Sequence, residues 1–221
     1  MKVSKLEGTT HSESEAGREL VYVDEFKQLI NDNPGVISSF LKFDDIVKEK
    51  NKNHNLKNGE IFEEGNLRLT TVDRSKEVEV GRPAFYYKAE IGDESFFIKS
   101  IPGNYYKPDE SMGAEEFQSI QKAKELLEGE EDVDVIDFQL GYEDKNGHTY
   151  FVSKWVEGVN INGYIEDQVK SNAERNRLVS KVLRILRLLD DSYYDVGRGN
   201  MMYDPVNKKI IVFDIFLTNK K

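Results

Sequence analysis

The sequence contains no cysteine among its 221 residues. Disulfide bonds and thiolate metal sites are therefore excluded, which fits a reducing compartment. Histidine is scarce as well: His11, His54 and His148 lie far apart, which argues against a histidine metal site or a Ser-His-Asp triad. No run approaches the roughly 20 apolar residues that cross a bilayer, and the first residues lack the apolar core of a secretory signal. We expect a soluble protein without a membrane span, cytoplasmic in the cell that makes it.

Basic residues are outnumbered, because 31 Lys and Arg stand against 41 Asp and Glu, giving a formal net charge of −10. Binding to a phosphate backbone depends on a basic face, so we expect no nucleic-acid partner. The hydrophobic fraction of 38% is enough for a folded core. The charged fraction of 33% and the mean hydropathy of −0.62 predict that part of the chain is solvated and poorly packed.

Composition divides the chain into three parts. Residues 1–20 are rich in Ser, Thr, Glu and Gly, and we predict that they are disordered. Residues 21–60 carry apolar positions at helical spacing on both sides of the breaker "NDNPG", which predicts two short helices followed by the polar linker "NKNHNLKNGE". We place a boundary near residue 60 and a single domain over residues 61–221.

Within residues 61–221, runs rich in β-branched and aromatic residues alternate with amphipathic ones. The runs "NLRLTTV", "AFYYKAEIG" and "SFFIKSI" predict three strands, and "GAEEFQSIQKAKELLEG" predicts a helix. Two further strands follow in "VIDFQLGYED" and "GHTYFVSKWV", then a long helix over residues 172–192. A polar loop leads to a last hairpin, "NMMYD" and "KIIVFDI". The expected fold class is α+β.

This order of elements matches the parts that phosphoryl transfer from ATP requires. In protein kinases these parts are a lysine on the third strand, a glutamate on the next helix, a D-x-x-x-x-N loop after a long helix, and an Asp in the turn after the next strand. Here Lys99 ends "SFFIK", Glu116 lies on the following helix, Asp195 and Asn200 have the loop spacing, and Asp214 follows "KIIVF".

The D-x-x-x-x-N spacing has no value by itself, because Asp167 and Asn172 also satisfy it. Context favours Asp195 and Asn200, which follow the long helix and precede the last hairpin. The alternative is that these residues are turn residues in an unrelated α+β fold.

The lysine and the glutamate each have a competitor nearby. Lys88 lies on the preceding strand, but Lys99 is on the strand just before the glutamate-bearing helix. Glu115 competes with Glu116, which we prefer because it directly precedes the apolar Phe117. Both glutamates also suit the first turn of an exposed helix, where the helix dipole favours carboxylates.

Residues 65–216 resemble the protein-kinase-like fold. "YYDVGRGNMMYD" followed by "IIVFDIF" is similar to the catalytic loops of bacterial kinases of this fold, in particular the small type III secretion effector kinases of enteric pathogens. The resemblance implies a five-stranded antiparallel N-lobe sheet with one helix, and a minimal C-lobe of long helix, catalytic loop and hairpin. The helices before residue 60 form an N-terminal extension that it does not cover.

The resemblance also implies cofactors and roles. ATP binds between two lobes, with "WVEG" as the hinge under the adenine, which makes Trp155, Val156 and Glu157 adenine-binding residues. Mg²⁺, or Mn²⁺, takes oxygen ligands from Asn200 and Asp214.

The resemblance further implies roles in the transfer itself, of which that of Arg198 stays open. Lys99 neutralises phosphate charge, and Asp195 orients the accepting hydroxyl and takes its proton. Arg198, between Asp195 and Asn200, either contacts the γ-phosphate or is a surface arginine.

The sequence departs from the kinase pattern at three places. The segment "DRSKEVEVGRPA" has no glycine-rich phosphate loop. The D-F-G triplet reads "DIF", so Ile215 and Phe216 follow Asp214. The chain ends at Lys221, so we expect neither an activation segment nor a lower C-lobe, and we expect the N-terminal helices to pack where that lobe would lie.

These features lead to two functional hypotheses. The first is a minimal ATP-dependent protein kinase, a Ser/Thr kinase and virulence effector secreted into a host cell, whose partner is a protein substrate. The second is a pseudokinase-like binding module that scaffolds or inhibits a host regulatory protein. A small-molecule kinase of the aminoglycoside or choline type is disfavoured, because such enzymes use a helical lobe after the magnesium Asp. The sequence does not indicate an oligomeric state.

Overall fold

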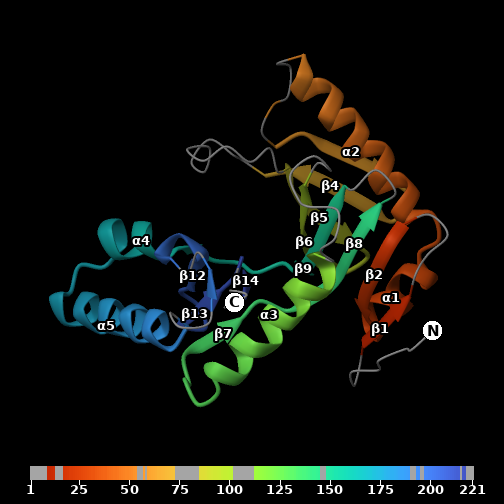
Figure 1. The fold of residues 1–221 in the computed structure, drawn as a ribbon. Helices are drawn as coiled ribbons and strands as arrows, with labels where there is room; N and C mark the ends of the chain where they lie inside the picture. The colour runs from red at the N-terminus through yellow and green to blue at the C-terminus, as the bar shows by residue number, and fades with distance from the viewer. Residues whose placement is uncertain are drawn as a thin grey trace. The chain divides into compact units, whose positions relative to one another are not determined.

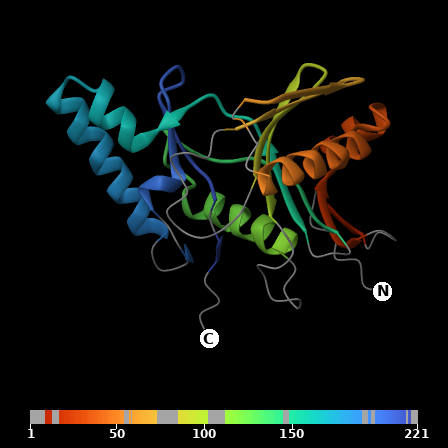
Figure 2. The ribbon, with the colours of Figure 1, turned by 90° about the horizontal axis from the view of Figure 1, so that it is seen from above.

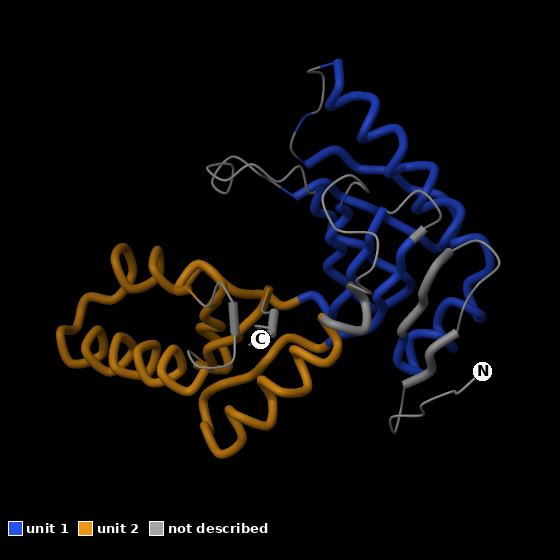
Figure 3. The backbone as a smooth tube through the Cα atoms, viewed as in Figure 1, with its two compact units in different colours: residues 1–113, 138–155 blue, residues 114–137, 156–221 orange. Residues whose placement is uncertain are grey.

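The computed structural model describes residues 9–12, 17–53, 57, 59–72, 85–101, 112–144, 148–189, 193–194, 197–214 and 216–217 (Figure 1). The chain divides into two compact units (Figure 3). Unit 1 comprises Met1–Gly113 and Phe138–Trp155, and unit 2 comprises Ala114–Asp137 and Val156–Lys221. Each unit therefore draws on two separate stretches of sequence.

Unit 1 is built on an eight-stranded sheet in the order β1-β2-β8-β9-β6-β5-β4-β3, and all neighbouring strands are antiparallel. The bounds are β1 Thr9–Ser12, β2 Gly17–Val23, β3 Ile61–Glu64, β4 Leu67–Thr71, β5 Phe85–Ile91, β6 Glu94–Ile101, β8 Phe138–Asp144 and β9 Thr149–Lys154. The α+β class is confirmed, and β4, β5, β6, β9 and β8 supply the five antiparallel strands that the resemblance implies. Strands β1, β2 and β3 widen that sheet at its two edges.

Burial alternates along the central strands because successive side chains of a strand point to opposite faces. On β5 the residues Phe85, Tyr87, Ala89 and Ile91 are buried, and the residues between them are half-buried. The expected strands therefore form where β-branched and aromatic residues alternate with polar ones.

Helices α1 Asp24–Asp32 and α2 Val36–Lys52 cover one face of this sheet, as Figure 1 shows for α2. Their buried apolar residues share one core with strands β4, β5, β6 and β9; those from the helices are Phe26, Val36, Phe40, Phe43 and Val47. The two predicted helices are confirmed, but the prediction that they replace a lower lobe is wrong, because this apolar face is already buried against the sheet.

The units also differ from the three parts expected from composition. Residues 9–12 and 17–23 form β1 and β2, whereas residues 1–20 were predicted to be disordered. The predicted boundary near residue 60 lies within unit 1, because α2 and the strands after residue 60 bury side chains in the same core.

Unit 2 contains helices α3 to α5 and a four-stranded sheet of order β10-β12-β13-β7, in which only β7 and β13 are parallel among the described strands. Its strands are β7 Val133–Val135, β10 Val159–Asn160, β12 Met201–Asp204 and β13 Lys209–Val212, with a separate pair β11 Tyr193–Tyr194 and β14 Phe216–Leu217. Its helices are α3 Met112–Leu126, which begins two residues before the unit, α4 Ile161–Gly163, the π-helix η1 Tyr164–Gln168, α5 Asn172–Leu189 and the 3₁₀ turn η2 Arg198–Asn200. Figure 2 shows α4, α5 and the hairpin β12–β13 from above.

Helix α5 is the predicted long helix, and one stripe of it is buried. Leu178, Val182, Ile185 and Leu189 recur every three or four residues and are at most 2% exposed. This spacing matches the turn of an α-helix, which explains why the sequence pattern identified it. Among the described residues, no helix combines the length and the apolar character needed to cross a membrane.

Candidate functional site

Asn200 and Asp214 lie side by side in unit 2, although 14 positions separate them in the sequence. The side-chain Nδ2 of Asn200 donates a hydrogen bond to the backbone carbonyl oxygen of Asp214 at 3.0 Å. In the reverse direction, the backbone amide of Phe213 donates to the carbonyl oxygen of Asn200 at 3.0 Å. The hairpin β12–β13 produces this proximity, because Asn200 directly precedes β12 and Asp214 comes two residues after β13.

The backbone at Asp214 has a left-handed conformation, with φ of +50°. Left-handed backbone angles are sterically unfavourable for most residues, and after Gly they are most common for Asn and Asp. An aspartate is therefore well suited to this position. The hydrogen bond from Asn200 to the carbonyl group of Asp214 holds this turn. Both side chains are half-buried.

The hairpin itself is fixed by contacts within unit 2. Tyr203 of β12 is 2% exposed, its ring centroid lies 4.4 Å from that of Tyr164 of η1, and burial raises the pKa of its hydroxyl. Lys209 of β13 pairs with Asp134 of β7 at 2.8 Å, and this hydrogen bond raises the pKa of the lysine. Gly158 lies so close to β12 that a Cβ atom there would be 3.2 Å from the carbonyl oxygen of Tyr203.

The turn between β12 and β13 is closed by the carboxylate of Asp204. Its Oδ1 accepts hydrogen bonds from the amides of Val206 at 2.9 Å and Asn207 at 3.0 Å, and its Oδ2 accepts from Nδ2 of Asn207 at 2.6 Å. The hydrogen bonds from Asn207, side chain first, lower the pKa of Asp204. The ionised carboxylate therefore stabilises the turn that brings the two ends of the hairpin together.

Lys99 lies in unit 1 on β6, the strand predicted for it, in register with Tyr86 of β5 and Phe151 of β9. The neighbouring Ser100 is 0% exposed and its hydroxyl points to helix α2, where it donates to Asp44. Because consecutive residues of a strand point to opposite faces, Lys99 lies on the sheet face away from α2.

Lys88, the competing lysine, lies on the same face of the sheet as Lys99, opposite Phe97 in the register of β5 and β6. Its Nζ is 3.3 Å from a carboxylate oxygen of Glu90 and 5.1 Å from the ring centroid of Trp155. The structure thus gives Lys88 an ion pair and a cation–π contact, which are ordinary structural roles.

The remaining described candidates, Glu116 and Arg198, lie in unit 2. Glu116 lies in α3 of unit 2 and is 8% exposed, whereas the side chain of Glu115 lies outside the described residues. Arg198 is exposed in η2. Asp195 lies outside the described residues.

The expected hinge coincides with a boundary in the chain. Trp155 is the last residue of unit 1, and the second stretch of unit 2 begins at Val156, followed by the exposed Glu157. The backbone amide of Trp155 donates to the carbonyl oxygen of Ser95 at 2.9 Å, and its ring lies 6.4 Å from that of Phe97.

The donor set at the hairpin fits a hard divalent cation. A carboxylate at Asp214 and an amide oxygen at Asn200 are the oxygen ligands that Mg²⁺ prefers, and protein sites for Mg²⁺ often supply only one or two such groups beside phosphates and water. Within the described ranges, no group of three or more His, Asp or Glu side chains is arranged to hold a metal ion. A metal ion bound by Asn200 and Asp214 would thus complete its coordination shell with phosphate oxygens of a bound molecule and with water.

Several solved structures are similar to this chain. The kinase PK-1 of Cydia pomonella granulovirus matches with a TM-score of 0.44 and 16% identity over 67% of this chain and 50% of that chain. The maize SIRK1 kinase domain bound to AMP-PNP matches with a TM-score of 0.40 and 14% identity, over 68% of this chain and 59% of that chain. The structure of Rad53 residues 1–466 in complex with AMP-PNP matches with a TM-score of 0.42 and 16% identity, over 69% of this chain and 39% of that chain. No protein-family model and no curated protein matches the sequence.

This chain therefore spans between 39% and 59% of the length of these three kinase structures. All three TM-scores are below 0.5, so the agreement with a kinase-like fold rests on the antiparallel strand order β4-β5-β6-β9-β8 and on the order of elements along the chain.

Proposed function

We propose that the protein is an ATP-dependent protein kinase. The observation that carries this proposal is the hydrogen bond between Asn200 and Asp214. It holds together an asparagine and an aspartate with a left-handed backbone conformation at the two ends of one hairpin. Neither residue needs this arrangement for the strand pairing of β12 and β13, which ends at Val212. Two residues with oxygen-bearing side chains that are brought together in this way suit a magnesium ion that carries nucleotide phosphates.

Mg²⁺ bound by these two residues would neutralise charge on the β- and γ-phosphates during transfer. The protein's own contribution is pre-organisation, because the hydrogen bonds between residues 200, 213 and 214 hold the side chain of Asn200 and the backbone of Asp214 before the metal arrives. Lys99 would neutralise α- and β-phosphate charge. Glu116 is proposed as the acid that orients this lysine.

Asp195 is proposed to orient the accepting hydroxyl and take its proton, and Arg198 to contact the γ-phosphate. The acceptor is proposed to be a Ser or Thr side chain of a protein, which in the effector hypothesis belongs to a host cell. Trp155, Val156 and Glu157 are proposed to border the adenine, since they lie at the point where the chain passes between units.

A transfer assay with radiolabelled ATP and Mg²⁺ or Mn²⁺ tests the proposal. Asp195→Asn and Asp214→Asn should each abolish phosphate incorporation into a generic acceptor, a host extract or the protein itself. Asp167→Asn is the matched control, because Asp167 begins the other D-x-x-x-x-N sequence and is exposed in η1.

Equal incorporation by the wild type and the Asp195→Asn and Asp214→Asn variants would refute the kinase proposal. No incorporation by any of the proteins, with no thermal stabilisation by ATP and Mg²⁺, would favour the binding-module hypothesis instead. Stabilisation that disappears in Asp214→Asn would support nucleotide binding even before an acceptor is known.

A further inference from the structure

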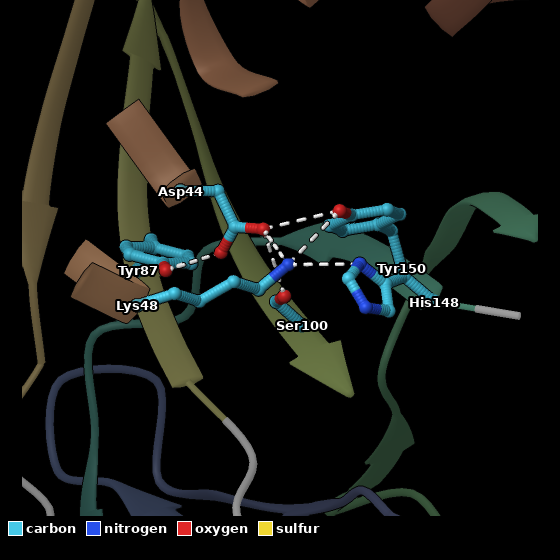
Figure 4. A network of polar contacts seen from close by, with 6 residues as sticks. All are labelled: Asp44, Lys48, Tyr87, Ser100, His148 and Tyr150. Atoms are coloured by element: carbon cyan, nitrogen blue, oxygen red, sulfur yellow. Dashed lines mark hydrogen bonds and ion pairs between the residues drawn. The ribbon is translucent and has the colours of Figure 1, made fainter. Parts of the chain in front are cut away.

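A buried carboxylate joins the N-terminal extension to the sheet of unit 1 (Figure 4). Asp44 of α2 is 0% exposed. Its Oδ1 accepts a hydrogen bond from the hydroxyl of Tyr87 at 2.5 Å, and its Oδ2 accepts from the hydroxyls of Tyr150 at 3.0 Å and Ser100 at 3.3 Å. These three residues lie on β5, β9 and β6, so one side chain of the helix connects three adjacent strands.

The charge of Asp44 is balanced within the same helix. Lys48, one turn further along α2, places its Nζ 2.6 Å from Oδ2 of Asp44, and its side chain is 14% exposed. The same Nζ lies 3.1 Å from Nδ1 of His148 and 3.4 Å from the hydroxyl of Tyr150. The carboxylate is thus hydrogen-bonded on both oxygens and paired with a cation, as a buried charge must be.

Stability alone does not account for this arrangement. Burying an ion pair costs desolvation energy, and apolar residues of similar volume are often equally stabilising. Apolar packing already joins α2 to the sheet beside Asp44, because Phe40 packs edge-on against Tyr87 and Tyr150 with ring centroids 5.7 and 5.5 Å away. The hydrogen bonds of Asp44 add directional contacts to this apolar packing, and such contacts define the positions of β5, β6 and β9 relative to α2.

Lys99 lies at this point of the sheet, on the opposite face. In the sheet, Lys99 of β6 is in register with Tyr86 of β5 and Phe151 of β9. Each residue bonded to Asp44 is the direct chain neighbour of one member of this row: Ser100 follows Lys99, Tyr87 follows Tyr86, and Tyr150 precedes Phe151. The carboxylate therefore fixes one face of the sheet at the point where Lys99 stands on the other face.

We propose that Asp44 is a positioning residue for Lys99 and that helix α2 is an integral part of the nucleotide-binding apparatus. The functional consequence rests on the proposed role of Lys99 in binding ATP phosphates. Displacements of about 1 Å at such a group reduce the rate of transfer strongly. An extension that the kinase-like fold does not include would then set the efficiency of the reaction from the reverse side of the sheet.

The test uses the full-length protein with Asp44→Asn, which keeps the shape of the side chain but removes its charge, and with Ser100→Ala, which removes only the hydroxyl next to Lys99. Glu64→Gln is the control, because the Lys42–Glu64 pair also joins α2 to the sheet, at 3.1 Å, but is exposed. We expect KM for ATP to rise at least about tenfold in the first two variants and to stay unchanged in the control. A loss of folded protein alone would lower kcat and leave KM for ATP unchanged.

A second readout is independent of catalysis. An amine-acylating reagent modifies lysines of the nucleotide-free protein, and mass spectrometry of peptides gives the rate at Lys99 relative to the exposed Lys154 on β9. We expect this ratio to change in Asp44→Asn and Ser100→Ala but not in Glu64→Gln. If the ratio changes although the wild type neither transfers phosphate nor is stabilised by ATP and Mg²⁺, the positioning role stands and the proposed function fails. An unchanged ratio and an unchanged KM for ATP in folded Ser100→Ala and Asp44→Asn would overturn the positioning role.

Discussion

Asn200 donates a hydrogen bond from Nδ2 to the backbone carbonyl oxygen of Asp214 at 3.0 Å, and the carbonyl oxygen of Asn200 accepts one from the amide of Phe213 at the same distance. Two consecutive residues after β13 are thus bound to the one residue that precedes β12. Asp214 keeps a φ of +50° within this reciprocal arrangement. The two candidate metal ligands consequently form one structural unit, and a change in either should affect the other.

Replacing Asn200 by Ala should reduce phosphate transfer about a hundredfold, because it removes an oxygen ligand and the donor that holds Asp214. Asn200→Asp keeps an oxygen ligand but loses the donor, and should lie between the wild type and Asn200→Ala. The measurement is kcat as a function of Mg²⁺ concentration. Asn207→Ala is the matched control, since Asn207 also donates a side-chain hydrogen bond in this hairpin, to Asp204 at 2.6 Å. Equal losses in the two Ala variants would show that only hairpin stability matters.

Lys99→Met and Lys88→Met separate the two candidate lysines. We expect Lys99→Met to lower kcat/KM for ATP about a hundredfold, as loss of a charge on the phosphates does. Lys88→Met should lower it by less than a factor of ten, because Lys88 is already paired with Glu90 and lies over the ring of Trp155. Steady-state kinetics with varied ATP decide between them, and the reverse order of effects would move the phosphate-binding role to Lys88.

Two glycines of unit 2 should respond oppositely to the same substitution. A Cβ at Gly158 would lie 3.2 Å from the carbonyl oxygen of Tyr203 and 3.3 Å from Cβ of Met202, so Gly158→Ala should destabilise the protein by about 1–3 kcal/mol. Gly163 has helical angles of −59° and −39° and nothing within 4 Å of a Cβ, so Gly163→Ala should stabilise it by about 0.5–1 kcal/mol. Urea unfolding measures both, and a destabilising Gly163→Ala would contradict the described helix.

Asp204 should make hairpin stability depend on pH. Because its pKa in the folded protein is lowered, by hydrogen bonds from Asn207 first, the folded state favours the ionised carboxylate. Its stabilising contribution is therefore fully present above the pKa of the unfolded chain, about 3.9, and is lost as the pH falls through the lower folded value.

The free energy of unfolding of the wild type should thus exceed that of Asp204→Ala at pH 7, and the difference should shrink below about pH 4. Parallel urea unfolding series from pH 7 to pH 2.5 give this difference directly. A difference that grows on acidification would mean that the protonated form of Asp204 is the one bound in the turn.

The main helices and central strands of this protein could be predicted from sequence because they have periodic patterns of apolar residues. Helix α5 has apolar residues every three or four positions, and β5 alternates buried and half-buried residues. Strand β1 was missed because its four residues are polar, and β2 was missed because its apolar residues Leu20–Val23 lead directly into the apolar pattern of α1. The pairing of β2 with β8 is a contact between distant parts of the sequence. The candidate residues could also be selected from the sequence, because the selection depends only on the order of the predicted strands and helices; they are Lys99, Glu116, Asp195, Asn200 and Asp214.

What the sequence by itself determined was therefore the α+β class, the order of the main strands and helices, and the short list of candidate residues. Only the tertiary structure decided that α1 and α2 cover the sheet of unit 1, that Asn200 holds Asp214, and that Asp44 binds the hydroxyls of three strands. An aspartate within an amphipathic helix is normally exposed, as Asp45 is, although Asp44 stands at helical spacing from the buried Phe40 and Val47. The difference arises because burial and hydrogen bonding depend on side chains that lie from 43 to 106 positions away.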